Sequence, residues 1–153
     1  MPNETTRTEN ENARVKISCK NVWKVFGPRP QQALGLIKEH STKEEILEKT
    51  GHVVAVKNTS FDVFEGEIFV IMGLSGSGKS TLVRCFNGLN KPTQGKVLAD
   101  GVDLASMNEQ ELRQARRHKI SMVFQHFALF PHRTVLENVA YGLELQKVSR
   151  VER

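Results

Sequence analysis

Residues 73–81 read GLSGSGKST, a composition that suits neither the interior of a helix nor that of a strand. Glycines let a backbone bend closely around a bound group, because no Cβ stands between that group and the backbone N–H donors. The lysine and the two hydroxyl residues that end the segment offer a positive charge and oxygen ligands. These residue types in this order predict a loop that binds a polyphosphate together with a divalent cation.

The flanking residues supply the context that such a loop needs. Residues 67–72, EIFVIM, form a short apolar run that predicts a buried strand. After the loop, Leu82, Phe86 and Leu89 recur at helical spacing and predict a helix with one core face. Strand, glycine loop and helix together fit the P-loop pattern G-x-x-x-x-G-K-[ST]. The alternative, a glycine-rich turn with a chance lysine, does not explain the agreement of all three parts.

Each polar residue of the loop has an expected task. Lys79 would place its charge on the β- and γ-phosphates, Ser80 would ligate Mg²⁺ through its hydroxyl, and Thr81 would donate to the α-phosphate side. The backbone N–H groups at the start of the helix would bind the remaining phosphate oxygens. The residues expected to contact the nucleotide phosphates are Gly73, Leu74, Ser75, Gly76, Ser77, Gly78, Lys79, Ser80 and Thr81.

The composition is that of an ordinary globular domain. The 153 residues are 39% hydrophobic and 25% charged, which allows one domain with a proper core, and no apolar run is long enough to span a membrane. Residues 1–14 lack the apolar segment of a signal peptide and are expected to form a disordered polar tail. Cys19 and Cys85 are too few for a disulfide framework and lack metal-ligand spacing, so both are expected to be reduced and semi-buried.

The net charge of +5 is concentrated in residues 112–119, LRQARRHK. A nucleic-acid patch is one interpretation, and a solvated helix face is the other. We favour the helix face, with Leu112 and Ala115 pointing inward and the three arginines facing water, because no aromatic residues are interleaved with the charges. No nucleic-acid partner is expected.

Before the glycine loop, two segments have a clear pattern. Residues 15–26 alternate in polarity and predict a strand pair or one long edge strand. Residues 29–51 predict a helical hairpin inserted before the next strand, and its second half has the start and stop signals of a helix. These signals are Ser41 with Glu44 or Thr42 with Glu45, and then Gly51.

After the loop, the expected order is a hairpin, a helix, a strand and a final helix. The hairpin turns at Asp100 and Gly101, and residues 119–125, KISMVFQ, predict a further buried strand. The whole is an α/β protein with most strands in one sheet. The two helices are predicted from capping residues, Asn108 with Glu111 and Thr134 with Glu137, and the last helix shows Leu136, Val139, Ala140 and Leu143 along one face.

Three strings, GLSGSGKSTL, NGLNKPTQGKVLADGVDL and ISMVFQHFALFPHRTVLENVAYGL, occur in an order that resembles the ATP-binding subunits of ABC transporters. The resemblance implies a P-loop NTPase core of the ABC type. Residues 15–153 would be the N-terminal part of its ATP-binding domain, with residues 134–153 the start of the helical subdomain. The helical insert and the phrase EGEIFVIMGLSGSGKST look like the glycine betaine/proline importers. Such a subunit would use ATP binding and hydrolysis to drive uptake of a quaternary ammonium osmolyte.

The resemblance also implies roles outside the P-loop. Phe26 falls where the family has an aromatic residue that stacks on adenine, with Trp23 a weaker candidate and an ordinary core phenylalanine the alternative. Gln125 falls on the Q-loop glutamine, which would contact Mg²⁺ and the attacking water and relay the nucleotide state; the alternative is a polar residue at a strand end. Residues 127–132 would lie near the groove that receives the membrane permease, or fold back into the domain.

Partners and location follow from the same resemblance. They are a second ATP-binding subunit in a head-to-tail dimer, a permease subunit contacted through the Q-loop region and, indirectly, a periplasmic or extracellular substrate-binding protein. The subunit would be peripheral, on the cytoplasmic face of the inner or plasma membrane. Like its relatives it would use ATP and Mg²⁺ as cofactors.

Three family motifs are not found in the 153 residues: the signature, the strand that ends in Asp-Glu, and the switch histidine. We therefore expect an N-terminal portion, truncated after the Q-loop, that binds nucleotide but does not hydrolyse it alone. Two other interpretations stay open. One is a non-hydrolysing nucleotide-binding fragment, and the other is a P-loop small-molecule kinase, which would need a lid or acceptor site.

Overall fold

The computed structural model describes residues 14–35, 37, 42–125 and 129–153. In this part of the chain an antiparallel four-stranded sheet has the order β2-β1-β3-β4. Its strands are β1 (Val15–Phe26), β2 (Val53–Phe64), β3 (Gln94–Ala99) and β4 (Val102–Asp103). The helices are α1 (Pro30–Leu34), α2 (Lys43–Thr50), α3 (Lys79–Phe86), α4 (Glu109–His118) and α5 (Val135–Leu145). The expected α/β class is confirmed, and the polar tail lies outside the described residues except for Arg14.

β1 is an interior strand of the sheet and not the expected edge strand. It pairs with β2 on one side, for example Phe26 with Val53, and with β3 on the other, where Trp23 is opposite Gln94. The alternating pattern that predicted the strand carries no information on how many neighbours it has. The sheet therefore places the C-terminal end of β1 beside the beginning of β2.

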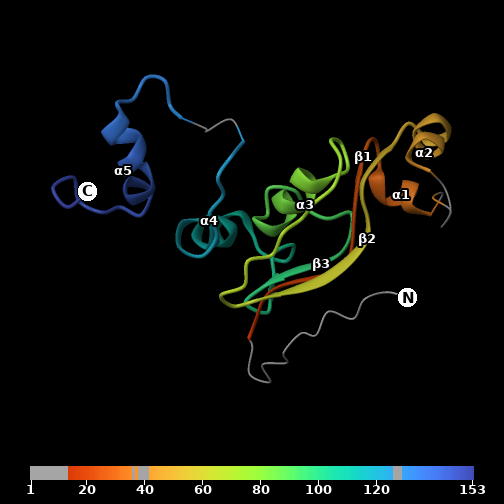
Figure 1. Cartoon of the computed structure of the whole chain (residues 1–153), viewed down its shortest axis with the longest axis horizontal. Coiled ribbons are helices and arrows are strands. Elements are labelled where there is room, and N and C mark those ends of the chain that lie inside the picture. The colour runs from red at the N-terminus through yellow and green to blue at the C-terminus, as the bar shows by residue number, and fades with distance from the viewer. Residues whose placement is uncertain (1–13, 36, 38–41, 126–128) are drawn as a thin grey trace.

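The insert between β1 and β2 contains the two predicted helices, which lie together at one end of the sheet (Figure 1). The second begins with a capping box: Thr42 Oγ1 accepts from the Glu45 N–H at 3.1 Å, and a Glu45 carboxylate oxygen accepts from the Thr42 N–H at 3.1 Å. The helix ends at Gly51 in the left-handed conformation, φ 68°. The alternative cap, Ser41, lies outside the described residues. Local capping chemistry thus fixes both ends of α2.

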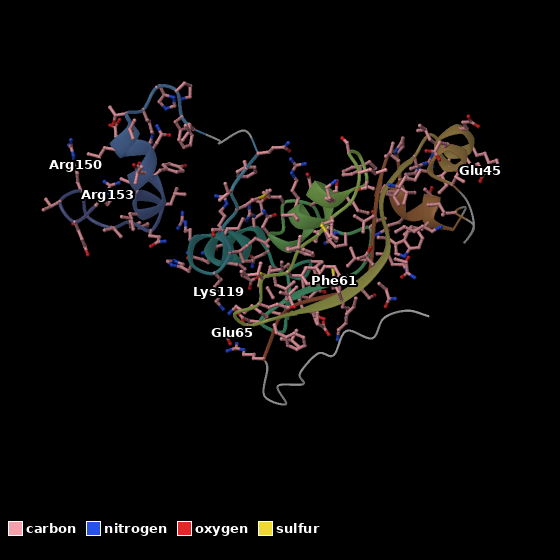
Figure 2. All side chains as sticks on the ribbon, in the orientation of Figure 1. Glu45, Phe61, Glu65, Lys119, Arg150 and Arg153 are labelled. Atoms are coloured by element: carbon pink, nitrogen blue, oxygen red, sulfur yellow. The ribbon has the colours of Figure 1, made fainter. Side chains whose placement is uncertain are left out.

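Two apolar clusters hold these elements together. The larger lies between the sheet and α3 and includes Phe61 of β2 (Figure 2). The Phe61 ring stacks on Phe69 at 4.6 Å between ring centroids and meets the edge of Phe86 at 5.7 Å. Its buried members are Cys19, Val22, Val56, Leu82, Cys85, Val97 and Leu104. The smaller attaches the insert to the sheet and consists of Val25, Ala33, Ile46 and Val54.

The two cysteines are fully buried and not semi-buried as expected. Burial raises the pKa of the Cys19 thiol to about 12, with a smaller contribution from the nearby Cys85, and burial likewise raises the pKa of Cys85. Both groups are therefore uncharged thiols that pack as small apolar side chains.

The predicted strand at residues 67–72 is not a strand in the structure. Phe69 packs on Phe61 and Ile71 packs against the larger core, whereas the neighbouring side chains are exposed, Ile68 by 91%, Val70 by 66% and Met72 by 86%. The prediction of a buried strand is therefore wrong on both counts, since the segment has no ladder within the described residues and most of its side chains are exposed. A hydrophobic run cannot supply the hydrogen-bonded neighbour that a strand needs.

The predicted strand at residues 119–125 differs in the same way. Ile120 packs against the core and Met122 accepts a hydrogen bond from the Asn87 side-chain amide, but Val123 is 95% exposed. Within the described residues no strand pairs with this segment or with residues 67–72. Apolar strands of this kind require sheet neighbours and a cover on both faces, which residues 14–125 do not provide.

The remaining elements follow their local signals. Asp100 and Gly101 both have positive φ and form the turn between β3 and β4, and Asn108 with Glu111 makes the capping box of α4. Ala115 of α4 is buried, as predicted for the inward face of that helix. Leu89 is an exception: α3 ends before it, and its side chain is exposed.

α5 lies apart from the sheet (Figure 1) and has no buried residue, so its apolar face, which includes Leu136 and Val139, is open to solvent. Its predicted cap is present, because Thr134 and Glu137 form a capping box. Among the described residues, no helix combines the length and the apolar character needed to cross a bilayer.

Candidate phosphate-binding site

The glycine loop leads directly into α3. That helix begins at Lys79, and its N-cap position is Gly78. The first N–H groups of a helix have no partner within it, and the helix dipole adds a partial positive charge at the same end. The loop therefore surrounds a set of donors suited to an anion, in the arrangement that the sequence predicts.

Gly78 is required by its close contact with β2. Its φ is 100°, and a Cβ built at this position would overlap the carbonyl oxygen of Ala55. The absence of a side chain thus lets the end of the loop lie directly on a strand of the sheet. The position of the helix N-terminus is fixed by that contact and by the burial of Leu82 and Cys85 one turn further on.

The Lys79 ammonium group lies within the curve of the loop. Its Nζ donates to the carbonyl oxygens of Gly73 at 2.7 Å and Leu74 at 2.6 Å, and it is 3.4 Å from Ser77 Oγ. The sequence between Glu67 and Asp100 contains no carboxylate. The local charge is therefore positive, and the lysine is bonded to neutral carbonyl groups and not to an acidic partner.

Ser80 and Thr81 occupy the first turn of α3, with Ser80 exposed and Thr81 half-buried. Within the described residues there is no group of three or more His, Cys, Asp or Glu side chains that could hold a metal ion. Mg²⁺ takes few protein ligands and prefers oxygen, and it is commonly held by a hydroxyl or carboxylate together with substrate phosphates. The Ser80 hydroxyl fits that pattern.

The aromatic ring at the end of β1 is the exposed one of the two candidates for base stacking. Phe26 is 42% exposed, and the Lys24 ammonium lies 4.9 Å from its ring centroid. Trp23 is half-buried and packs against the smaller core. β2 links Phe26 to the loop, because Phe26 pairs with Val53 while the carbonyl of Ala55 contacts Gly78. The two positions on β2 are about 7 Å apart along the strand.

Gln125, the last residue of the segment 119–125, is exposed and lies in a turn, and not at the end of a paired strand. Among the described residues, no hydrogen bond joins it to residues 73–81. Of residues 127–132, which were expected near the permease groove or folded back into the domain, 127 and 128 lie outside the described residues. The structure therefore brings Phe26 and the P-loop to one strand but does not bring Gln125 to them by a direct contact.

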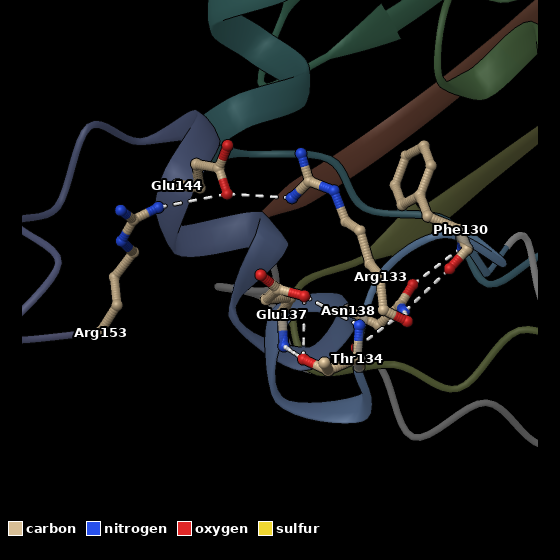
Figure 3. A network of polar contacts seen from close by, with 7 residues as sticks. All are labelled: Phe130, Arg133, Thr134, Glu137, Asn138, Glu144 and Arg153. Atoms are coloured by element: carbon tan, nitrogen blue, oxygen red, sulfur yellow. Dashed lines mark hydrogen bonds and ion pairs between the residues drawn. The ribbon is translucent and has the colours of Figure 1, made fainter.

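A polar network that the sequence analysis missed organises the segment after Gln125 (Figure 3). The Asn138 side chain of α5 accepts from the Phe130 N–H at 2.8 Å and donates to the carbonyl oxygens of Phe130, Arg133 and Thr134. One asparagine thus ties the whole turn before α5 to the helix. Its only signal in the sequence is its place one turn after the Thr134 cap.

The same network includes the ion pairs of Glu144 with Arg133 and Arg153. Arg133 Nη1 lies 3.0 Å from Glu144 Oε2, and its guanidinium stands over the rings of Phe130 and Tyr141 at 5.3 and 4.9 Å. Glu144 also pairs with Arg153 at 3.3 Å. The hydrogen bond from Arg133 lowers the pKa of the Glu144 carboxyl and raises that of Arg133 itself.

Comparison with known proteins agrees with this geometry. A family model described as ABC transporter matches residues 56–153, which include the glycine loop, α3 and Gln125. The chain belongs to the ABC transporter family. It is 56% identical over 139 residues to the glycine betaine/proline betaine transport system ATP-binding protein ProV of Escherichia coli (strain K12), covering 91% of this chain and 35% of that protein. The glycine betaine transport ATP-binding protein OpuAA of Bacillus subtilis (strain 168) is 55% identical, with 91% and 33% covered.

This ABC family member therefore spans about a third of the length of the curated relatives that it matches. Among solved structures it is similar to the ATP-binding cassette MJ0796, described as a dimer in a post-hydrolysis state bound to ADP and Pi. The TM-score is 0.69 at 34% identity, covering 89% of this chain and 51% of that one. The expected P-loop fold of the ABC type is confirmed by this likeness.

Proposed function

We propose that this chain is the nucleotide-binding part of the ATP-binding subunit of an ABC importer that takes up a quaternary ammonium osmolyte of the glycine betaine/proline type. The observation that carries the proposal is the Lys79 ammonium held inside a glycine loop at the N-terminus of α3. The substrate class is supported by the relatives at 55–56% identity, which are glycine betaine transport ATP-binding proteins, and by no contact with an osmolyte in the described residues.

In this proposal each residue of the site has one task. The N–H groups at the start of α3 and the Lys79 ammonium bind the phosphates, and Thr81 donates on the α-phosphate side. Mg²⁺, held by Ser80 and by Gln125 once the latter approaches, would neutralise charge on the phosphates. Phe26 stacks on the adenine, and the stretch of β2 from Val53 to Ala55 sets the separation between base and phosphate sites.

The partners belong to the proposal as well. The likeness to dimeric cassettes supports a second ATP-binding subunit placed head to tail. A membrane permease would contact the region from Gln125 to α5, and a periplasmic or extracellular binding protein would act through that permease. Such a subunit would be peripheral, on the cytoplasmic face of the inner or plasma membrane. It would be a transport ATPase only when those partners and the remaining family motifs are present.

A narrower function, nucleotide binding without hydrolysis, is favoured for the 153 residues by themselves. Phosphoryl transfer needs a group that orients and deprotonates the attacking water. Among the described residues, no carboxylate and no hydrogen bond from Gln125 reaches the Lys79 ammonium, whose partners are all in the loop. Phosphate binding and catalysis are therefore separable properties of this family member.

A chimera tests the proposed function. The matching segment of the Escherichia coli ProV relative would be replaced by this chain's residues, and glycine betaine uptake would be measured in cells that lack other betaine transport. We expect uptake with the chimera and none with the same chimera carrying Lys79→Ala. A chimera that is produced and binds ATP, yet supports no uptake, would contradict the osmolyte-import function.

A further inference from the structure

His52 is a nearly buried polar side chain between α2 and β2 to which the function described above gives no role. Only 9% of its surface is exposed. Its Nδ1 lies 2.7 Å from the carbonyl oxygen of Thr50, and its Nε2 lies 2.5 Å from that of Pro28. A carbonyl oxygen only accepts hydrogen bonds, so the ring bonds to either one as an N–H donor.

The two carbonyl groups belong to opposite ends of the insert. Thr50 ends α2, whereas Pro28 comes two residues after Phe26, where the chain leaves β1. The ring also lies close to Gly27, because a Cβ built there would be 2.6 Å from His52 Cδ2. His52 therefore joins the exit of β1 to the entry of β2 across 24 residues of sequence.

The contacts of the His52 ring act on the segment that carries the exposed Phe26 ring. Phe26 is held on one side by its pairing with Val53, the residue after His52, and the chain just beyond it is held by the His52 ring. On the side-chain face, Lys24 lies over the ring and is itself fixed by a 2.9 Å hydrogen bond from its Nζ to the Lys91 carbonyl oxygen. A half-exposed ring at a strand end would otherwise lose rotamer and backbone freedom on binding a base.

We propose that His52 is a positioning residue for the adenine site: its hydrogen bond to the Pro28 carbonyl fixes the end of β1 and so holds Phe26 ready to stack. The inference rests on the proposed nucleotide-binding function. It assigns to His52 an effect on the base and none on the phosphates, because the recorded partners of His52 are all in residues 27–50 and those of Lys79 all in the glycine loop.

The test compares two ligands that share phosphates but not a base. The affinities of the 153-residue chain for Mg-ATP and for Mg-tripolyphosphate would be measured by calorimetry on the same protein samples. Loss of folded protein lowers both apparent affinities together. The ratio of the Mg-ATP affinity to the Mg-tripolyphosphate affinity therefore reports the base site alone. The variants are His52→Ala, His52→Gln and His52→Asn, with His118→Ala on the exposed end of α4 as the matched control.

Glutamine and asparagine distinguish the two carbonyl contacts of the ring, of which a neutral imidazole, with its single N–H, donates to only one. The amide nitrogen of glutamine reaches about as far as Nε2 and can donate to Pro28, whereas that of asparagine reaches only the place of Nδ1 beside Thr50. We expect His52→Ala and His52→Asn to lower the ratio about three- to tenfold, since these variants lose only part of the stacking of the base on Phe26. His52→Gln and His118→Ala should leave the ratio within about twofold of the original, a range that corresponds to less than about 0.5 kcal/mol.

The outcomes separate this inference from the function on which it rests. An unchanged ratio in His52→Ala, or equal ratios in the glutamine and asparagine variants, would overturn the positioning role if Phe26→Ala still lowers the ratio. An unchanged ratio in Phe26→Ala would instead overturn the adenine site itself, and the role of His52 with it.

Discussion

The contact between Gly78 and β2 makes a sharp prediction about the glycine loop. Gly78→Ala adds a methyl group that overlaps the Ala55 carbonyl oxygen, at a backbone φ of 100°. The left-handed conformation costs a residue with a Cβ about 1–2 kcal/mol, and forcing an extra carbon into a packed contact costs about 1–3 kcal/mol. We therefore expect the free energy of unfolding to fall by about 2–5 kcal/mol, a large share of the stability of a small domain.

Gly76→Ala is the matched control. Gly76 has a similar left-handed φ of 75°, but no atom lies within 4 Å of a Cβ built there. Its substitution should therefore cost only the conformational part, about 1–2 kcal/mol. Urea denaturation of the two variants, followed by circular dichroism, gives the difference directly. Equal losses of stability in the two variants would refute the conclusion that the loop is fixed by its contact with Ala55.

Three further predictions concern the base, the turn and catalysis. Phe26→Ala should weaken ATP binding by about 1–3 kcal/mol in calorimetry while Phe26→Trp preserves it, and a larger effect from Trp23→Ala would show that the wrong aromatic was chosen. The hydrogen bond and charge of Lys16 lower the pKa of Asp100, so its contribution to stability is present at neutral pH and is lost as pH falls from the ordinary carboxyl range through the lower folded value. Asp100→Asn, which keeps a residue suited to the positive φ of this turn, should be less stable than the original at pH 7, and the difference should shrink as pH falls below the ordinary carboxyl range; a difference that stays constant as pH falls would contradict the ion pair. The 153-residue chain should release no phosphate from ATP above the background of a Lys79→Ala sample, and turnover that disappears in that sample would reveal a catalytic base not identified in these residues.

Features encoded over a few residues were predictable from the sequence. The P-loop pattern gives the start of α3 because glycine, lysine and serine spacing is a local requirement of the loop. The capping boxes of α2, α4 and α5 were likewise found, because a side chain and a backbone N–H three residues apart decide them. The roles of Phe26 and Gln125 came from family resemblance and remain predictions.

Features that depend on distant partners were not predictable. Residues 67–72 and 119–125 have the apolar composition of buried strands, yet a ladder needs a second strand whose position no local pattern specifies. The contact of His52 with the Pro28 carbonyl joins residues 24 apart in the sequence, and the Asn138 network depends on how a turn folds back on α5. In the sequence each is a single polar residue with no pattern around it.

The central claim is that residues 73–81 bind the phosphates of ATP through Lys79. Calorimetric titration of the purified chain with Mg-ATP tests it most directly, with Lys79→Ala as the variant and Lys96→Ala, an exposed lysine of β3, as the control. A charge-assisted hydrogen bond is worth about 1.5–3 kcal/mol, so the affinity should fall at least about tenfold in Lys79→Ala and stay unchanged in Lys96→Ala. Equal ATP affinity in the original chain and in Lys79→Ala, with both proteins folded, would contradict the account.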